Sequence, residues 1–340
     1  MLKIIIIITP ILIIATLPQC KGFRSDNPSL MDLNKSMIFF NYTTNEICLL
    51  DIDTGVVGKK YKLAFNVHKY NFNKWYYSNG DAYIYLLERR RDSGTKIYKI
   101  GIDTFELSEI YRTKKYFHNF CINNNYLYLM SYVEPSNQNP NKEQNYILEH
   151  NLLSGSEKII DFNKSLPKDE RICSPDFFVH ENRIIMTGWV KEHALKKLYQ
   201  YDIKSKKINV IDEKAGYFSI FDDIILYTKN NVDVVFVNDF VTTIRWKGAS
   251  LAIYDIKNNT SKVLPYKVNT AYLDFLTINK SVMIYTNEHK TIQTLINRFW
   301  LFPIKRRYKD YYIAEINGND QRLFFSSADT IKILGVIDNK

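Results

Sequence analysis

The side chains best suited to acid–base or metal chemistry near neutral pH are the six histidines of the chain. A helical zinc-protease site needs two histidines four residues apart, and Glu192-His193 has no second histidine at that spacing. Cys48, Cys121 and Cys173 show no Cys-x-x-Cys spacing, so neither a zinc site nor a redox dithiol is indicated. The sequence therefore predicts no bound metal and no cofactor.

Motifs for hydrolytic or phosphate chemistry are also absent from the sequence. The chain has no Gly-x-Ser-x-Gly elbow of a serine hydrolase and no Gly-x-x-x-x-Gly-Lys phosphate loop. The segment Asp51-Ile52-Asp53-Thr54-Gly55 is similar to the start of a calcium loop but lacks the downstream glutamate. We assign no catalytic residue, and a non-enzymatic role is favoured.

The N-terminal segment differs from the rest of the chain. Lys3 precedes a nearly continuous apolar run at residues 4–17, which is shorter than the roughly 20 residues of a transmembrane helix. A basic start before such a run is typical of a secretory signal. We expect residues 1–19 to be a signal peptide, residues 20–28 a linker and residues 29–340 a single domain. An uncleaved anchor is the alternative.

The end of the apolar run resembles the lipobox of bacterial lipoproteins. In Leu17-Pro18-Gln19-Cys20 the cysteine would receive the lipid and anchor the chain to a membrane. Gln19 departs from the pattern, since the residue before the cysteine is normally small. The alternative is that Cys20 is an ordinary cysteine near a conventional cleavage site.

The formal net charge is +10, and a basic balance favours nucleic acid, anionic lipid or acidic glycans as partners. An exported protein rarely meets nucleic acid, so the charge favours anionic lipid or acidic glycans. We expect an extracytoplasmic protein with a protein or glycan partner and no nucleic acid, and a membrane association would run through an N-terminal lipid or signal anchor. Excess lysine is also explained by a compositional bias that gives many Asn, Ile and Tyr residues. The oligomeric state is left open.

One short pattern recurs six times: an alternating apolar strand, an acidic or small residue, an aliphatic residue and a polar turn. The acidic or small residue falls at positions 51, 101, 151, 202, 255 and 315, with spacings of 50, 50, 51, 53 and 60 residues. In Tyr199-Gln200-Tyr201-Asp202-Ile203 the odd members share one face, because side chains alternate along a strand. Further strands before and after the pattern make four strands per repeat.

Periods of roughly 40–50 residues with four strands each belong to propeller blades. The repeats resemble the generic blade of β-propellers, as in periplasmic translocation-associated and surface-exposed propellers, over residues 29–337. The resemblance implies an all-β fold of six four-stranded blades, with seven blades as the alternative and a large β-sandwich as the competitor. We expect the strand at residues 331–337 to complete the blade that begins near residues 29–33. No functional residue is carried over, because WD40 and kelch signatures are absent.

Candidate binding surfaces lie where the repetition breaks. The fifth repeat carries an insertion at residues 230–248 and the sixth one at residues 286–307, and long loops on one rim often bind partners. An aromatic and basic run in the sixth insertion is expected to meet an anionic membrane or a partner. The alternative is an elongated hairpin folded back on its blade. The predicted interaction loop comprises Arg298, Phe299, Trp300, Phe302, Lys305, Arg306 and Arg307.

Two histidines are candidates for the central channel. His118 and His180 flank or lie in presumed inner strands, where a pair would bind a metal or act as acid and base; simple packing is the alternative. Arg89-Arg90-Arg91 is a solvated loop or a glycan or phosphate contact.

We predict an exported, non-enzymatic propeller that recognises a protein, glycan or envelope component through one rim. The alternative is a glycan hydrolase or lyase with acidic residues in the channel.

Overall fold

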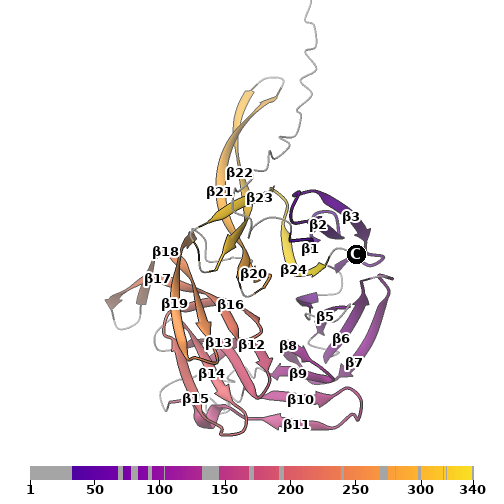
Figure 1. The fold of residues 1–340 in the computed structure, drawn as a ribbon, viewed down its shortest axis with the longest axis vertical. Coiled ribbons are helices and arrows are strands. Elements are labelled where there is room, and N and C mark those ends of the chain that lie inside the picture. The colour runs from indigo at the N-terminus through magenta and orange to yellow at the C-terminus, as the bar shows by residue number, and fades with distance from the viewer. Residues whose placement is uncertain are drawn as a thin grey trace, which may run out of the picture.

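The protein forms six antiparallel four-stranded sheets, which follow one another around a ring (Figure 1). The fold is therefore the predicted all-β propeller with six blades. No helix among the described residues is long and apolar enough to cross a membrane. The computed structural model describes residues 33–67, 72–77, 83–90, 94–102, 104–131, 145–167, 172–190, 195–238, 241–268, 275–279, 281–297, 300–316, 318 and 320–338.

Each blade has its strands in sequence order from the inside outward, except that the last strand of the chain begins blade 1. Blade 1 contains β24 (Ile331–Asp338), β1 (Lys35–Asn41), β2 (Glu46–Asp51) and β3 (Val57–Lys62). Blade 2 contains β4 (Phe72–Tyr77), β5 (Tyr83–Arg90), β6 (Gly94–Gly101) and β7 (Leu107–Thr113). Blade 3 contains β8 (Phe117–Asn123), β9 (Tyr126–Ser131), β10 (Ile147–Asn151) and β11 (Glu157–Ile160), followed by the short 3-10 helix η3 (Asn163–Ser165).

The other three blades repeat this arrangement. Blade 4 contains β12 (Ile172–His180), β13 (Arg183–Val190), β14 (Leu195–Asp202) and β15 (Ile208–Asp212). Blade 5 contains β16 (Ala215–Phe221), β17 (Ile224–Asn238), β18 (Val241–Asp255) and β19 (Thr260–Val268). Blade 6 contains β20 (Phe275–Thr277), β21 (Val282–Asn297), β22 (Trp300–Glu315) and β23 (Gln321–Ser327).

The hydrophobic core is divided into six clusters, one at each interface between neighbouring blades. In β1, Met37 and Phe39 pack against blade 6, whereas Ile38 and Phe40 pack against blade 2. Both faces of this strand are buried, because side chains alternate between the two faces of a sheet. Burial on both faces explains why the second strand of each repeat is a continuous apolar run rather than an alternating one.

The ring is closed by pairing the two ends of the chain. β24 runs antiparallel to β1 with a register from Lys35↔Asp338 to Asn41↔Ile331. In Figure 1 the yellow C-terminal strand lies beside the indigo β1. The prediction that residues 331–337 complete the first blade is confirmed.

The recurring acidic position of the repeat organises the turn that follows the third strand. Asp51 Oδ1 accepts the backbone N–H of Thr54 at 2.7 Å. Asp202 Oδ1 accepts the N–H of Ser205 at 2.6 Å in the equivalent turn of blade 4. Such Asx turns replace backbone pairing at the end of a strand. Backbone donors lower the pKa of Asp202 and also that of Asp255, because hydrogen bonds to the carboxylate favour its charged form.

The aliphatic residue that follows joins two turns of the same blade. The backbone N–H of this aliphatic residue donates a hydrogen bond of 2.7–3.0 Å to a backbone carbonyl. The carbonyl belongs to a residue at the start of the second strand of the same blade, or in the turn just before it. Two of these side chains, Ile52 and Ile256, are fully buried. The sixfold sequence pattern therefore encodes turn and core structure. The donor–acceptor pairs are Ile52–Lys35, Leu152–Asn125, Ile203–Asn182, Ile256–Asp223 and Ile316–Ser281.

Candidate functional site

The propeller has two different rims, because its inner strands share one direction. Neighbouring strands β8 and β12 show this: Asn119 Nδ2 donates to Asp176 Oδ1 at 3.3 Å, and four residues later Asn123 Nδ2 donates to Val179 O at 3.3 Å. We call the end at which the inner strands begin the loop rim, and the opposite end the turn rim. The connections from second to third strand and from blade to blade lie on the loop rim.

The two rims differ in the length of their connections. The turn rim carries short turns with left-handed residues such as Asn124, Glu181 and Asp222. On the loop rim, β17 and β18 have 15 residues each, and β21 and β22 have 16 each. These two hairpins extend beyond the ring (Figure 1). The sixth insertion is therefore an elongated hairpin, but it points away from the ring and is not folded back on its blade.

The predicted interaction loop belongs to this sixth-blade hairpin. Arg298 and Phe299 lie outside the described residues, as does the predicted lipidation site Cys20. The role of this loop stays a prediction. Its other members lie in β22, where Trp300, Phe302, Lys305, Arg306 and Arg307 pair in register with Asn297, Leu295, Ile292, Thr291 and Lys290.

The two candidate channel histidines lie at opposite rims, so the structure does not bring them together as a pair. His118 is the second residue of β8, and Arg89 Nη1 lies 2.7 Å from its Nδ1. His180 is the last residue of β12, and its Nε2 lies 3.4 Å from Asp223 Oδ1 in a turn of blade 5. The Lys257 ammonium, and then His180, hold the pKa of Asp223 below its usual value. His180 thus joins two blades at the turn rim.

A cluster of cations and aromatic rings surrounds His118 where blades 2 and 3 meet at the loop rim. The Arg89 guanidinium lies 5.7 Å from the centroid of the Tyr116 ring, within cation–π range. The Tyr116 and His118 rings meet edge to face at 4.9 Å. Lys114 and Lys115 are exposed in the connection between the blades. Among the described residues, no carboxylate lies within ion-pair distance of Arg89, Lys114 or Lys115.

The sequence positions this cluster through two close approaches of blade 2 to the connection that follows it. Gly94 has a φ of +82°, and a Cβ on it would lie 2.1 Å from Thr113 O and 2.7 Å from Lys114 Cα. Thr95 Oγ1 accepts the N–H of Phe117 at 2.9 Å in a buried position. The strand that follows Arg89 is therefore held against the chain that leads to His118.

We expect Gly94→Ala to destabilise the protein more than Gly155→Ala does. Both glycines have a left-handed φ, but a Cβ on Gly155 meets nothing within 4 Å. Gly155→Ala should therefore cost about 1 kcal/mol of backbone strain, and Gly94→Ala at least about 1 kcal/mol more, since the backbone must move. Urea unfolding of both variants measures the difference. Equal losses would show that the approach of Gly94 to Thr113 does not constrain the rim.

A second polar group continues around the loop rim from blade 3 to blade 5. Asp176 accepts from Asn119, and Lys196 Nζ lies 3.9 Å from Asp176 Oδ2. Lys196 Nζ also lies 4.7 Å from the centroid of the Tyr217 ring. The loop rim thus carries Arg89 in blade 2, Tyr116 in the connection to blade 3, Lys196 in blade 4 and Tyr217 in blade 5.

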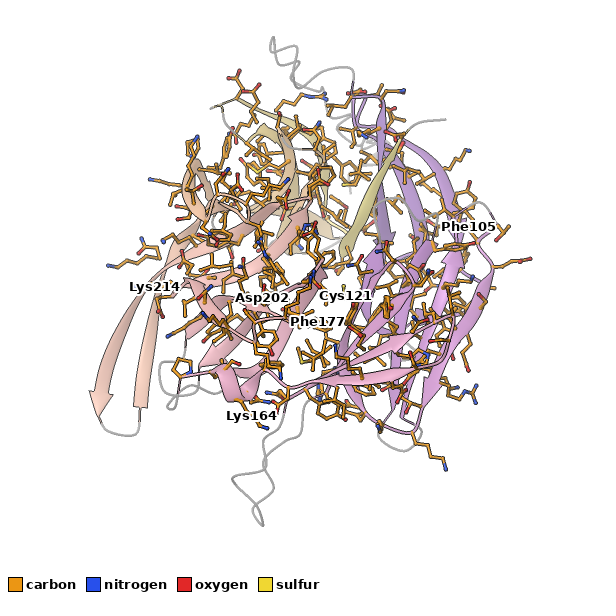
Figure 2. The ribbon with its side chains drawn as sticks, turned by 60° about the horizontal axis from the view of Figure 1, so that its bottom comes forward. Phe105, Cys121, Lys164, Phe177, Asp202 and Lys214 are labelled. Atoms are coloured by element: carbon orange, nitrogen blue, oxygen red, sulfur yellow. The ribbon has the colours of Figure 1, made fainter. Side chains whose placement is uncertain are left out.

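The sequence identified the arginine run of blade 2 and His118 separately, but not that they meet. The missing information is that the second-to-third strand connection and the blade-to-blade connection share one rim. Cys48 and Cys121 are buried and unbridged, and they pack as small apolar side chains. Burial raises the pKa of the Cys48 thiol to about 11. In Figure 2, Cys121 lies near Phe177 in the interface of blades 3 and 4.

Comparison with known proteins gives a fold and no sequence family. No family model matches the chain, and no curated protein sequence matches it. TolB from Acinetobacter baumannii is similar over 89% of this chain, with 10% identity and a TM-score of 0.54, and this chain spans 65% of that protein. A putative TolB from Agrobacterium tumefaciens matches 87% of this chain and 90% of its own, at 9% identity and a TM-score of 0.46.

A weaker likeness covers 88% of this chain and 34% of the tricorn protease, at 9% identity and a TM-score of 0.42. At such identities the likeness to solved structures concerns the fold alone. The sheet order, the closing strand and the similarity to the Acinetobacter protein agree on one architecture. The chain is a six-bladed β-propeller.

Proposed function

We propose that the protein is an exported, non-enzymatic propeller that binds a protein or glycan partner through its loop rim. The observation that carries the proposal is the asymmetry of the ring: both long hairpins leave from the loop rim, while the turn rim carries short, repeated turns. Rims with long connections are where propellers and other repeat proteins carry binding surfaces. The basic start and apolar run at residues 3–17 support export.

The alternative of a glycan hydrolase or lyase finds less support. Such chemistry needs two carboxyl groups roughly 5–10 Å apart. In the described inner strands the carboxylates are those of Asp176 in blade 4 and Asp338 at the end of β24 in blade 1. Asp176 is engaged by Asn119, and Asp338 forms an ion pair with Lys35 at 2.5 Å. These two acids serve contacts within the ring.

Site-specific photocrosslinking in the native host tests the choice of rim. A benzoylphenylalanine placed at Lys214 or Lys247, both exposed on the loop rim, should give a discrete adduct with the partner. The same residue at Leu153 or Lys204, exposed on the turn rim, should give none. The benzophenone abstracts hydrogen from C–H bonds and therefore reports protein and glycan partners alike.

Two results would contradict the proposal. Adducts of equal yield from both rims would show that the asymmetry of the ring does not direct binding. Adducts from the turn rim alone would place the partner on the regular turns. Thermal unfolding of the four substituted proteins serves as the control, because all four positions are exposed and each variant should melt with the parent.

A further inference from the structure

In the part of the chain that the structure describes, Arg89, Lys114 and Lys115 have no carboxylate within ion-pair distance. Arg89 contacts a ring nitrogen of His118 and the face of the Tyr116 ring. Neither of these groups carries a negative charge. Elsewhere on the loop rim, Lys197 and Lys229 pair with Glu213 and Asp212 at 2.6 and 2.7 Å. Among the described residues, Arg89, Lys114 and Lys115 are therefore three cations without a carboxylate partner at the blade 2–3 junction.

The junction is also held in place. Gly94 packs against the backbone of Thr113 and Lys114, and Thr95 holds the N–H of Phe117. Arg89 is half-buried and braced on the Tyr116 ring, so its planar group loses little freedom when it meets a ligand. A braced guanidinium suits a planar oxyanion, because the guanidinium binds carboxylates through two parallel hydrogen bonds. The exposed Lys114 and Lys115 add two positive charges in the adjoining connection.

We propose that Arg89, Lys114, Lys115 and His118 form a docking site for carboxylates, and that the ligand is an acidic segment of a protein partner. The inference rests on the proposed function and names the partner for one part of the loop rim. Arg and Tyr are the residue types that dominate protein interfaces. One face of Tyr116 is covered by Arg89, and this face cannot stack on a sugar.

The test measures binding of a fluorescein-labelled octaglutamate peptide to the full chain by anisotropy at low salt, where surface charges are least screened. The rim variant Arg89→Gln/Lys114→Gln/Lys115→Gln should bind at least tenfold more weakly. The matched control is Lys204→Gln/Lys206→Gln/Lys207→Gln, which removes three positive charges from exposed positions on the turn rim. The control should stay within about twofold of the parent. Thermal melts establish that both variants remain folded.

Other outcomes would overturn the inference. Equal weakening in both variants would mean that the peptide responds only to net charge. An octagalacturonate of the same charge that binds more tightly than octaglutamate, through the same three residues, would make the ligand a glycan. If octaglutamate does not bind while loop-rim crosslinks persist, this site is wrong and the proposed function stands. If the loop-rim crosslinks are also absent, the proposed function fails independently.

Discussion

A chain that ends before β24, with residues 331–340 removed, should lose cooperative folding altogether. β24 supplies the inner strand of blade 1, and its Ile331 and Leu334 side chains are 3% and 7% exposed. Burial of two such side chains contributes roughly 1.5–3 kcal/mol each, and the backbone pairs with β1 are lost as well. This is comparable with the roughly 5–15 kcal/mol net stability of a typical domain. Circular dichroism and urea titration would show the loss.

A circular permutant provides the control for this deletion. Lys35 and Asp338 are directly opposite in the β1–β24 register, so a two-residue Asn-Gly turn can join the end of β24 to the start of β1. The permutant, with new termini between β23 and β24, should regain the cooperative transition of the parent. A truncated chain that melts within a few degrees of the parent would contradict the role of β24 in closing the ring.

Arg322→Met should be the most damaging single substitution at the seam between blades 6 and 1. Arg322 Nη2 donates to Ile52 O at 3.2 Å and its Nη1 donates to Asp53 O at 3.0 Å, and the side chain is 9% exposed. Methionine fills a similar volume but leaves both carbonyls and the Asp53 carboxylate without this donor. The cost of breaking such buried charged contacts is about 3 kcal/mol.

The interface between blades 4 and 5 contains a similar arginine that makes fewer contacts and is less buried, so the two substitutions can be compared. Arg183 Nη1 donates to Ile256 O at 3.2 Å, at the repeat position that corresponds to Ile52, and its side chain is only half-buried. Arg183→Met should therefore cost about 1 kcal/mol, the net value of one such bond. Urea unfolding of both variants gives the comparison. If Arg183→Met costs as much as Arg322→Met, then the closing seam has no special dependence on its arginine.

The sequence predicted the architecture well because each repeat is defined by short-range features, namely a turn residue and the aliphatic residue next to it. The Asx turns at Asp51 and Asp202 and the aliphatic residue after each of them recur at nearly constant spacing. Hence the number of blades, the number of strands per blade and the closing strand could all be predicted from the sequence. The direction of the sixth-blade hairpin was not, since a local pattern of apolar residues does not fix whether a long hairpin returns to its blade.

Contacts between blades were harder to predict than contacts within them. Arg89 and His118 are 29 residues apart, and Arg322 and Ile52 are 270 apart. Neither pair follows from periodicity, because each depends on which rim a connection occupies and on how the ring closes. His118 and His180 illustrate the same limit: both lie on inner strands as expected, yet at opposite ends of them.

Crosslinking from the loop rim, repeated on a chain without its long hairpins, tests the central claim most directly. Asn230 pairs with Ala249, and Glu288 pairs with Lys309, so an Asn-Gly turn can replace the residues between each pair and leave the blades intact. Benzoylphenylalanine at Lys214 should give a partner adduct in the parent and a strongly reduced one in the trimmed chain, with Leu153 silent in both. An adduct from Lys214 that persists undiminished after trimming would show that the two long hairpins do not carry the binding. An adduct that forms equally from Leu153 would contradict binding through the loop rim.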